Sequence, residues 1–319
     1  RVSFIISKYS QYINFPIYLS AEGMEKKRLN DNEAIWLKSK RSVKEEEYKE
    51  FYKYLTHDFD DPLLWIHNKV EGKQEYSNLL YIPKKSPFDL WNRDTPKGLK
   101  LFIQRVFVMD DAAHFLPIYL RFVKGVIDSN DLPLNVSREI LQEHPLVESI
   151  KKAVTKRVLD ALKKLKKDDL KAYQEFWHEF GLALKEGPAE DYENKEEIAS
   201  LFIFASSNND DDEINVDLES YIGRMDKDQD KIYYCLGETY EAALNSPHIE
   251  SLKKADTEVL LLTDRIDEWL MTTLAEYSGK ELVNAAKADF DDAESKPKVS
   301  KDNEKLIERI ASKLKDEVA

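Results

Sequence analysis

The sequence places an arginine in the first turn of an expected helix. Residues 131–142 read DLPLNVSREILQ, in which a turn at Leu132–Pro133 precedes a helix with Ser137 as its N-cap. Arg138 then lies where the helix macrodipole already places partial positive charge, an unfavourable position for a cation. An arginine presented from a turn in this way is typical of an arginine finger, which stabilises charge on a transferred phosphoryl group.

Two polar neighbours fit the same chemistry. Gln142 follows Arg138 by four residues and therefore shares its helical face, and Asn135 precedes it in the loop, where it could contact the same anion. The alternative is a structural arginine paired with Asp131 or Glu139, in which case the chain would be a non-catalytic scaffold for protein interactions. The spacing alone leaves both interpretations open.

The other common chemical sites are absent from the sequence. The nine glycines are too far apart for either glycine-rich phosphate loop, and the six histidines never recur at i, i+4, which disfavours zinc. Asp226, Asp228 and Asp230 begin like a calcium loop, but Lys231 replaces the glycine that its sharp turn needs. We therefore expect no metal site and interpret this segment as a solvated loop.

Composition limits the partners and the compartment. The chain of 319 residues has 42% hydrophobic residues and a net charge of −13, which disfavours nucleic acid and an anionic membrane as partners. No apolar run approaches the roughly 18 residues of a spanning helix. The single cysteine, Cys235, fits a reducing cytoplasm, and its flanks KIYYCLGE predict a packed thiol in a buried strand rather than a nucleophile. The start at Arg1 suggests a segment of a longer protein.

The elements that would position the arginine alternate in type over residues 1–143. We expect strands at 2–9, 12–19, 79–83 and 98–108, with period-two apolar residues in the second and the last. KEEEYKEFYKYL, residues 44–55, predicts an amphipathic helix. This pattern indicates an α/β or α+β domain.

The remaining sequence is helical and then alternating. Residues 145–187 carry two helical stripes with a boundary at Asp168–Asp169, and 208–215 form a charged loop. Strands at 231–237 and 257–263, apolar enough to be parallel, alternate with helices at 239–247 and 266–277. Beyond a linker, a last helical stripe has no visible partner; it comprises Leu306, Ile307, Ile310, Leu314 and Val318.

Three long segments resemble the heat-shock protein 90 chaperone family, most closely its bacterial members. They are RVFVMDDAAHFLPIYLRFVKGVIDSNDLPLNVSREILQ at 105–142, HNKVEGKQEYSNLLYIPKKSPFDLWNRD at 67–94, and DRIDEWLMTTLAEYSGK at 264–280. The resemblance implies the middle segment of that chaperone. Its fold would be a large αβα sandwich (1–143), a helical coil (144–201), a smaller αβα sandwich (202–286), and a linker with the first helix of a C-terminal dimerisation domain (287–319).

The resemblance also implies roles for individual residues. Arg138 corresponds to the catalytic arginine that reaches the γ-phosphate of ATP, with Asn135 and Gln142 supporting the loop and Phe107 docking on the ATP-binding domain. ATP with Mg²⁺ would be bound by an N-terminal domain absent here, so we expect no cofactor and no turnover from these residues alone. Client-protein contacts are implied for a set that includes several aromatics, although aromatics at helical spacing are also typical of a core: Trp36, Phe88, Leu90, Trp91, Trp269, Leu270 and Met271.

The implied partners follow from the same family. They are the chain's own N-terminal ATP-binding domain, unfolded or partly folded clients, and a second copy through the C-terminal domain, in a cytoplasmic, stress-related protein-folding role. Neither nucleic acid nor membrane is expected.

Overall fold

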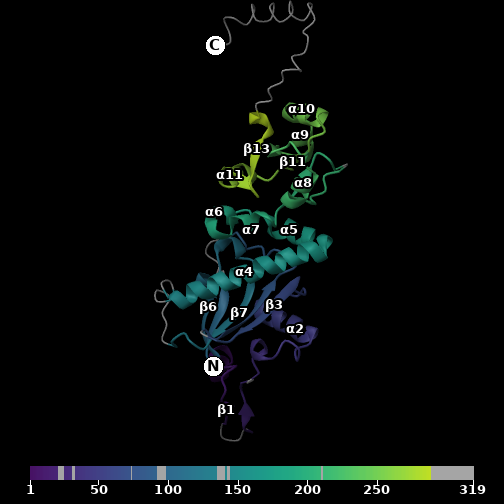
Figure 1. Ribbon diagram of the computed structural model, residues 1–319. Coiled ribbons are helices and arrows are strands. Elements are labelled where there is room, and N and C mark those ends of the chain that lie inside the picture. The colour runs from purple at the N-terminus through teal and green to yellow at the C-terminus, as the bar shows by residue number, and fades with distance from the viewer. Residues whose placement is uncertain are drawn as a thin grey trace, which may run out of the picture. The chain divides into compact units, whose positions relative to one another are not determined.

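A computed structural model gives the arrangement of the chain (Figure 1). The chain divides into two compact units, Arg1–Ala285 and Ala286–Ala319. The expected terminal helix and the loop residues Asn135, Arg138 and Gln142 lie outside the described residues, and the predicted boundaries at 143, 201 and 286 stay predictions. The structure describes residues 1–20, 25–30, 33–72, 74–91, 98–134, 141, 144–209 and 211–288.

A five-stranded mixed sheet forms the centre of the first half of the chain. Its order is β3 (Leu64–Val70), β4 (Tyr76–Ile82), β7 (Lys124–Ser129), β5 (Leu99–Ile103) and β6 (Val106–Ala112). Only the β5–β7 pair is parallel. The period-two pattern of β5 is confirmed, since Leu99, Leu101 and Ile103 are fully buried.

Helices cover both faces of this sheet, which gives the predicted αβα layers (Figure 1). Helix α4 (Pro145–Asp168) packs its predicted stripe, from Ile150 to Leu162, into one core. Helix α2 (Glu45–Thr56) and the 3₁₀ turn η1 (Ile35–Leu37) pack into the other. Two further 3₁₀ turns, η2 (Ala113–Phe115) and η3 (Ile118–Leu120), lead from β6 to β7.

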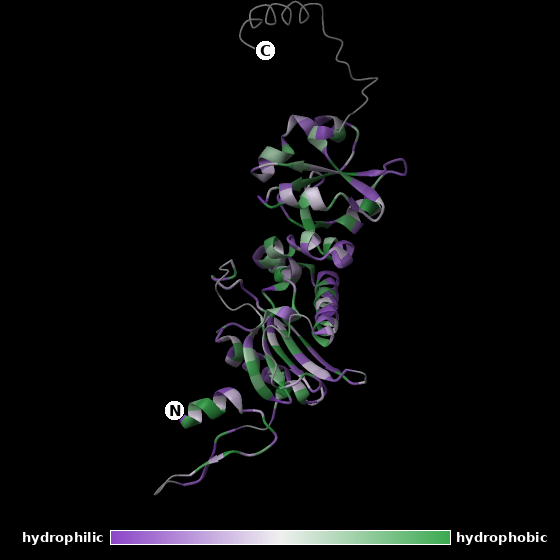
Figure 2. Cartoon of the chain, turned by 90° about the vertical axis from the view of Figure 1, so that its left-hand side faces the viewer, coloured by the Kyte–Doolittle hydropathy of each residue, from purple (hydrophilic) through white to green (hydrophobic). Residues whose placement is uncertain are grey.

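The prediction of two strands before residue 20 was wrong. Residues Val2–Tyr9 form helix α1, which satisfies its backbone through local bonds such as Ser10 N to Ile6 O and buries no side chain. Figure 2 shows this apolar helix beside the N-terminus. Of residues 12–19 only β1 (Tyr18–Leu19) is a strand, paired with β2 (Lys27–Arg28) in a separate ribbon. None of the period-two residues of 12–19 belongs to a described hydrophobic core, and Phe15 is 77% exposed.

A helical segment follows α4, as predicted. Asp169 ends α4 and caps α5 (Leu170–Leu184) by accepting a hydrogen bond from Ala172 N. Short helices α6 (Gly187–Glu190), η4 (Tyr192–Asn194) and α7 (Lys195–Ala199) complete it. The second predicted stripe is buried apart from its first residue, Leu170.

A six-stranded sheet forms the smaller α/β part, in the order β12 (Glu276–Tyr277), β13 (Lys280–Asn284), β10 (Lys231–Leu236), β11 (Val259–Leu262), β8 (Ile203–Ser206) and β9 (Val216–Asp217). The parallel pairing predicted for β10 and β11 is confirmed. The accompanying helices are α8 (Leu218–Arg224), α9 (Tyr240–Leu244), η5 (Pro247–Ile249), α10 (Glu250–Lys254), α11 (Asp267–Thr273) and η6 (Ala285–Lys287).

Helix α11 is shorter than the predicted 266–277. Ser278 and Gly279 have φ values of 51° and 73°, so they form a tight turn that pairs Tyr277 with Lys280. Residues 276–277 therefore become strand β12. Within the described residues, no helix is both long and apolar enough to cross a bilayer.

Candidate functional site: the arginine loop and its surroundings

The described residues on either side of the arginine loop are fixed in one core. Leu132 is 2% exposed before the loop and Leu141 is fully buried within it, and both belong to the core beneath α4. The chain before and after Arg138 is therefore anchored near the end of β7 and the start of α4.

Polar contacts fix the segment that enters the loop. The Ser129 hydroxyl accepts hydrogen bonds from the backbone N–H groups of Asp131 and Leu132, both at 3.3 Å. The Asp131 carboxylate accepts one from Glu75 N at 2.6 Å, which joins the loop entry to the β3–β4 connection. One oxygen of this possible ion-pair partner of Arg138 is therefore already engaged.

The exit from the loop is a capped helix start. His144 Nδ1 accepts a hydrogen bond from Leu146 N at 3.2 Å, and Pro145 occupies the first helical position, where its missing N–H costs nothing. Helix α4, which begins at this cap, lies across one face of the sheet (Figure 1).

A buried carboxyl group supports the same end of β7. Asp128 is 3% exposed and accepts hydrogen bonds from Trp36 Nε1 at 2.9 Å and Arg105 N at 3.1 Å. Gln104 and Arg105 form the β5–β6 turn with φ values of 50° and 67°, a conformation that costs energy for residues other than glycine. Burial raises the pKa of Asp128. The Asp128 carboxyl therefore holds a strained hairpin turn against β7.

Trp36 is part of the core of this face. Its side chain is fully buried, and its carbonyl oxygen lies 3.0 Å from His67 Nε2, while His67 Nδ1 lies 2.7 Å from the Tyr48 hydroxyl. A neutral imidazole that donates from Nε2 and accepts at Nδ1 satisfies both contacts. A client could reach Trp36 only after this network opens.

Phe107, the expected docking residue, is half-buried at the edge of the sheet. Its ring contacts those of Tyr9 and Phe102 at 5.7 Å and 5.6 Å. With Phe4 and Tyr54 it lines a cavity of about 260 Å³ between α1, α2 and the sheet. The docking role stays a prediction.

The remaining client candidates divide by exposure. Phe88, Trp91 and Trp269 are 100%, 53% and 45% exposed. Leu90 and Leu270 are buried and Met271 is half-buried. Three aromatic side chains could therefore contact a client without any rearrangement. The two leucines instead pack their segments into the core.

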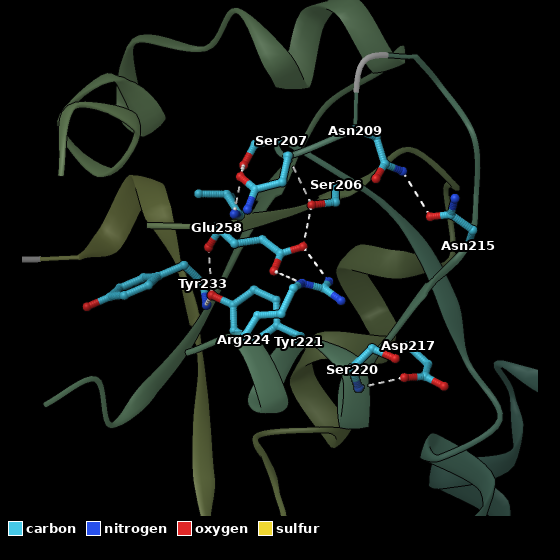
Figure 3. Close-up of polar contacts among 12 residues, drawn as sticks. Ser206, Ser207, Asn209, Asn215, Asp217, Ser220, Tyr221, Arg224, Tyr233 and Glu258 are labelled. Atoms are coloured by element: carbon cyan, nitrogen blue, oxygen red, sulfur yellow. Dashed lines mark hydrogen bonds and ion pairs between the residues drawn. The ribbon is translucent and has the colours of Figure 1, made fainter. Parts of the chain in front are cut away.

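Sequence reasoning missed a polar cluster at one end of the smaller sheet (Figure 3). Arg224 Nη2 and Nε donate to the two carboxylate oxygens of Glu258 at 2.8 Å and 3.0 Å, and Ser206 donates to one of them at 2.6 Å. The Tyr221 hydroxyl donates to the carbonyl of Glu258 at 2.6 Å. Because these contacts occupy both carboxylate oxygens, the cluster fastens α8 to β11.

Two further ion pairs, each with a buried cation, were also missed: Arg121 with Glu186, and Lys185 with Asp267. The second pair joins residues 82 positions apart, so no local spacing indicates it. The packed thiol predicted for Cys235 is confirmed. Cys235 is buried in β10, where burial raises its pKa, and no cluster of metal-ligating side chains occurs among the residues that the structure covers.

Known proteins resemble this chain over most of its length. A family model described as Hsp90 protein matches residues 21–319. Chaperone protein HtpG of Shewanella amazonensis is 52% identical over an alignment of 343 residues, which covers all of this chain and 54% of HtpG. The chain therefore spans about half the length of that relative. The middle domain of a putative heat shock protein of Plasmodium falciparum matches with a TM-score of 0.71 and 35% identity, over 80% of this chain and all of that domain.

Proposed function

Because this chain belongs to the Hsp90 family, with the fold of an Hsp90 middle domain, we propose that it completes the ATPase site of a chaperone with Arg138 and contributes client-binding surface. ATP and its Mg²⁺ would be held by an N-terminal domain. Arg138 would supply a planar set of donors to the charge that develops on the γ-phosphate.

The observation that carries the proposal is the anchoring of the arginine loop. Leu132 and Leu141 are buried on either side of Arg138, and Asp131 is bonded to the β3–β4 connection. An arginine that must reach a phosphate on another domain needs a loop with fixed ends, because misplacing a catalytic group by about 1 Å can lower the rate about a hundredfold. Asn135 and Gln142 would hold the loop in its active position.

The test is steady-state ATP turnover of the full-length protein with Arg138→Ala. We expect turnover to fall at least tenfold, about 1.4 kcal/mol in transition-state free energy, with nucleotide affinity unchanged. Arg41→Ala, at an exposed arginine of the same unit, is the control and should leave both quantities unchanged.

Two outcomes would contradict the proposal. Unchanged turnover together with a lower melting temperature would identify Arg138 as a structural arginine in an interaction scaffold. Turnover by residues 1–319 alone at the full-length rate would place the whole ATPase site within this chain.

The client-binding part of the proposal is supported by the exposed side chains of Phe88, Trp91 and Trp269. Large exposed apolar side chains suit segments of unfolded protein, which offer apolar residues without a fixed shape. Binding of the full-length protein to a labelled, reduced and carboxymethylated α-lactalbumin, a permanently unfolded probe, tests it through alanine variants of Trp91 and Trp269. We expect each variant to weaken binding about threefold.

A further inference from the structure

We propose that Lys185 and Glu186, consecutive residues at the C-terminal end of α5, form a joint that positions Trp91 and Trp269 as one composite client surface. The inference rests on the proposed client binding, which it deepens by naming the residues that hold the two tryptophans. The joint consists of two ion pairs, one on each side of the α5 terminus.

On one side, Lys185 holds the start of helix α11. Its Nζ atom lies 2.6 Å from Asp267 Oδ1 and 2.7 Å from Asp264 Oδ2, and its side chain is 3% exposed. The rings of Trp177 and Phe204 lie 5.6 Å and 5.5 Å from the same atom, within cation–π range. Lys185 is therefore enclosed by two carboxylates and two aromatic rings.

The start of α11 depends on this contact through Asp267. This residue is fully buried in the first turn of the helix and also accepts a hydrogen bond from Asp264 N at 3.0 Å. A buried carboxylate is costly unless it is paired, so the position of Asp267 depends on Lys185. Trp269 lies two residues further along this short helix, and its exposure depends on where α11 begins.

On the other side, Glu186 holds the segment of Trp91. Its two carboxylate oxygens accept from Arg121 Nη1 and Nη2 at 2.6 Å and 2.8 Å, a bidentate pair with Arg121 only 8% exposed. The guanidinium carbon of Arg121 lies 4.6 Å from the centroid of the Trp91 ring. Glu186 thus orients the cation on which this exposed ring stacks.

The two tryptophans are consequently connected by an unbroken series of contacts. It runs from Trp91 through Arg121 and Glu186 to the neighbouring Lys185, and then through Asp267 into α11. Because Lys185 and Glu186 are adjacent in the chain, a shift of the α5 terminus would move both ion pairs. A client that contacts both rings would find their supporting segments already held by the α5 terminus, which lowers the ordering cost of binding.

The first experiment measures backbone hydrogen exchange in the full-length protein. Lys185→Met should raise exchange of the Leu270 and Leu274 amides, which close α11, at least tenfold, and Lys185→Arg should restore much of the protection. The control is Lys152→Met, which breaks an exposed pair with Glu193 and should leave α11 unchanged. If Lys185→Met prevents folding, the double variant Lys185→Met/Asp267→Asn removes both charges and should still exchange faster in α11 than the wild type.

The second experiment measures affinity for the unfolded α-lactalbumin probe. We expect Trp269→Ala to weaken binding in the wild type but to have no further effect with Lys185→Met, because α11 is then already displaced. Glu186→Gln should abolish the effect of Trp91→Ala in the same way. A purely structural Lys185 would leave the effect of Trp269→Ala at threefold in both backgrounds, and that result would overturn the joint.

The two experiments separate the failure of the joint from failure of client binding. If neither tryptophan variant alters affinity in the otherwise wild-type protein, the client surface is rejected, alone and as a composite of Trp91 and Trp269. The exchange data would still decide whether Lys185 holds α11. Wild-type exchange of α11 in Lys185→Met would overturn the joint even if both tryptophans bind the probe.

Discussion

The two α/β parts of the chain bury polar groups in opposite ways. In the larger part, the Trp36 indole donates to Asp128, and the His67 imidazole bridges the Trp36 carbonyl and the Tyr48 hydroxyl. Among the described contacts, Arg105 reaches Asp128 through its backbone N–H. The smaller part and the helices before it use ion pairs. Lys166 with Asp217 and Arg224 with Glu258 lie at 2.6 Å and 2.8 Å.

This difference determines which kinds of substitution each region tolerates. Burial costs neutral side chains such as Trp36, Tyr48 and His67 less hydration free energy than it costs an ion, so their network depends mainly on volume and on complete hydrogen bonding. A buried ion pair depends on both charges, because removal of one leaves the other unpaired in a low-dielectric site. Changes of volume should therefore affect the larger part most, and changes of charge the boundaries of the smaller part.

The largest expected effect is from Trp36→Ala. It removes a fully buried indole, its contacts with Tyr12, Phe51 and Phe102, and the hydrogen bond to Asp128. We expect a loss of about 3–5 kcal/mol in the free energy of unfolding, measured by urea denaturation followed by circular dichroism.

The control for this change is Trp269→Ala, which removes the same side chain from a position 45% exposed. We expect a loss below about 1 kcal/mol there. Equal losses at the two positions would mean that Trp36 is not part of the stabilising core, and its role as a client contact would regain support.

The contrast also explains which features could be predicted from the sequence. Local periodicity was sufficient for α2, for the stripe of α4, for the helix boundary at Asp168–Asp169 and for the buried residues of β5, since each depends on residues within a few positions. It failed for residues 2–9 and 12–19, where apolar patterns predict strands. A strand needs a neighbouring strand, and the described contacts of Val2–Tyr9 are those of a helix.

Hydrogen-bond and ion-pair partners that lie far apart in the chain could not be predicted from the sequence. Trp36 is hydrogen-bonded to Asp128 across 92 positions, and Lys185 is paired with Asp267 across 82. The local sequence pattern therefore predicts neither the burial of these residues nor their pairing. The arginine loop is a different case. Its anchors are described, whereas Arg138 itself rests on family resemblance and stays a prediction.

A smaller effect is expected from Arg224→Met, which tests the role of ion pairs in the smaller part. Arg224→Met leaves Glu258, 7% exposed, with Ser206 as its remaining side-chain partner, and we expect a loss of about 2 kcal/mol in the free energy of unfolding. The double variant Arg224→Met/Glu258→Gln should recover part of this loss, because no unpaired charge remains.

The matched control is Lys254→Met, which breaks an exposed i, i+4 pair with Glu250 and should cost less than about 0.5 kcal/mol. A loss at Lys254 as large as that at Arg224 would show that burial does not distinguish the two ion pairs.

The smallest effect should be the pH dependence that His67 gives to the stability of the larger part. Burial lowers the pKa of His67 below its usual 6.5, so the unfolded chain takes up a proton in a range where the folded network excludes it. The stability that His67 contributes is therefore present above pH 6.5 and is lost as the pH falls below that value. Asp128 acts in the opposite direction, because its raised pKa lets the folded state hold a proton that the unfolded state releases.

The contribution of His67 can be isolated by comparison with His67→Gln, in which the titration of Asp128 is retained. We expect the wild type to lose stability relative to the variant between pH 7 and pH 5.5, measured by urea midpoints at each pH. A constant difference over that range would mean that folding does not shift the pKa of His67, whereas a gain in relative stability as the pH falls would mean that the imidazole is protonated in the folded state. The Tyr48 hydroxyl would then accept from Nδ1 instead of donating to it, and the larger part would contain a buried cation after all.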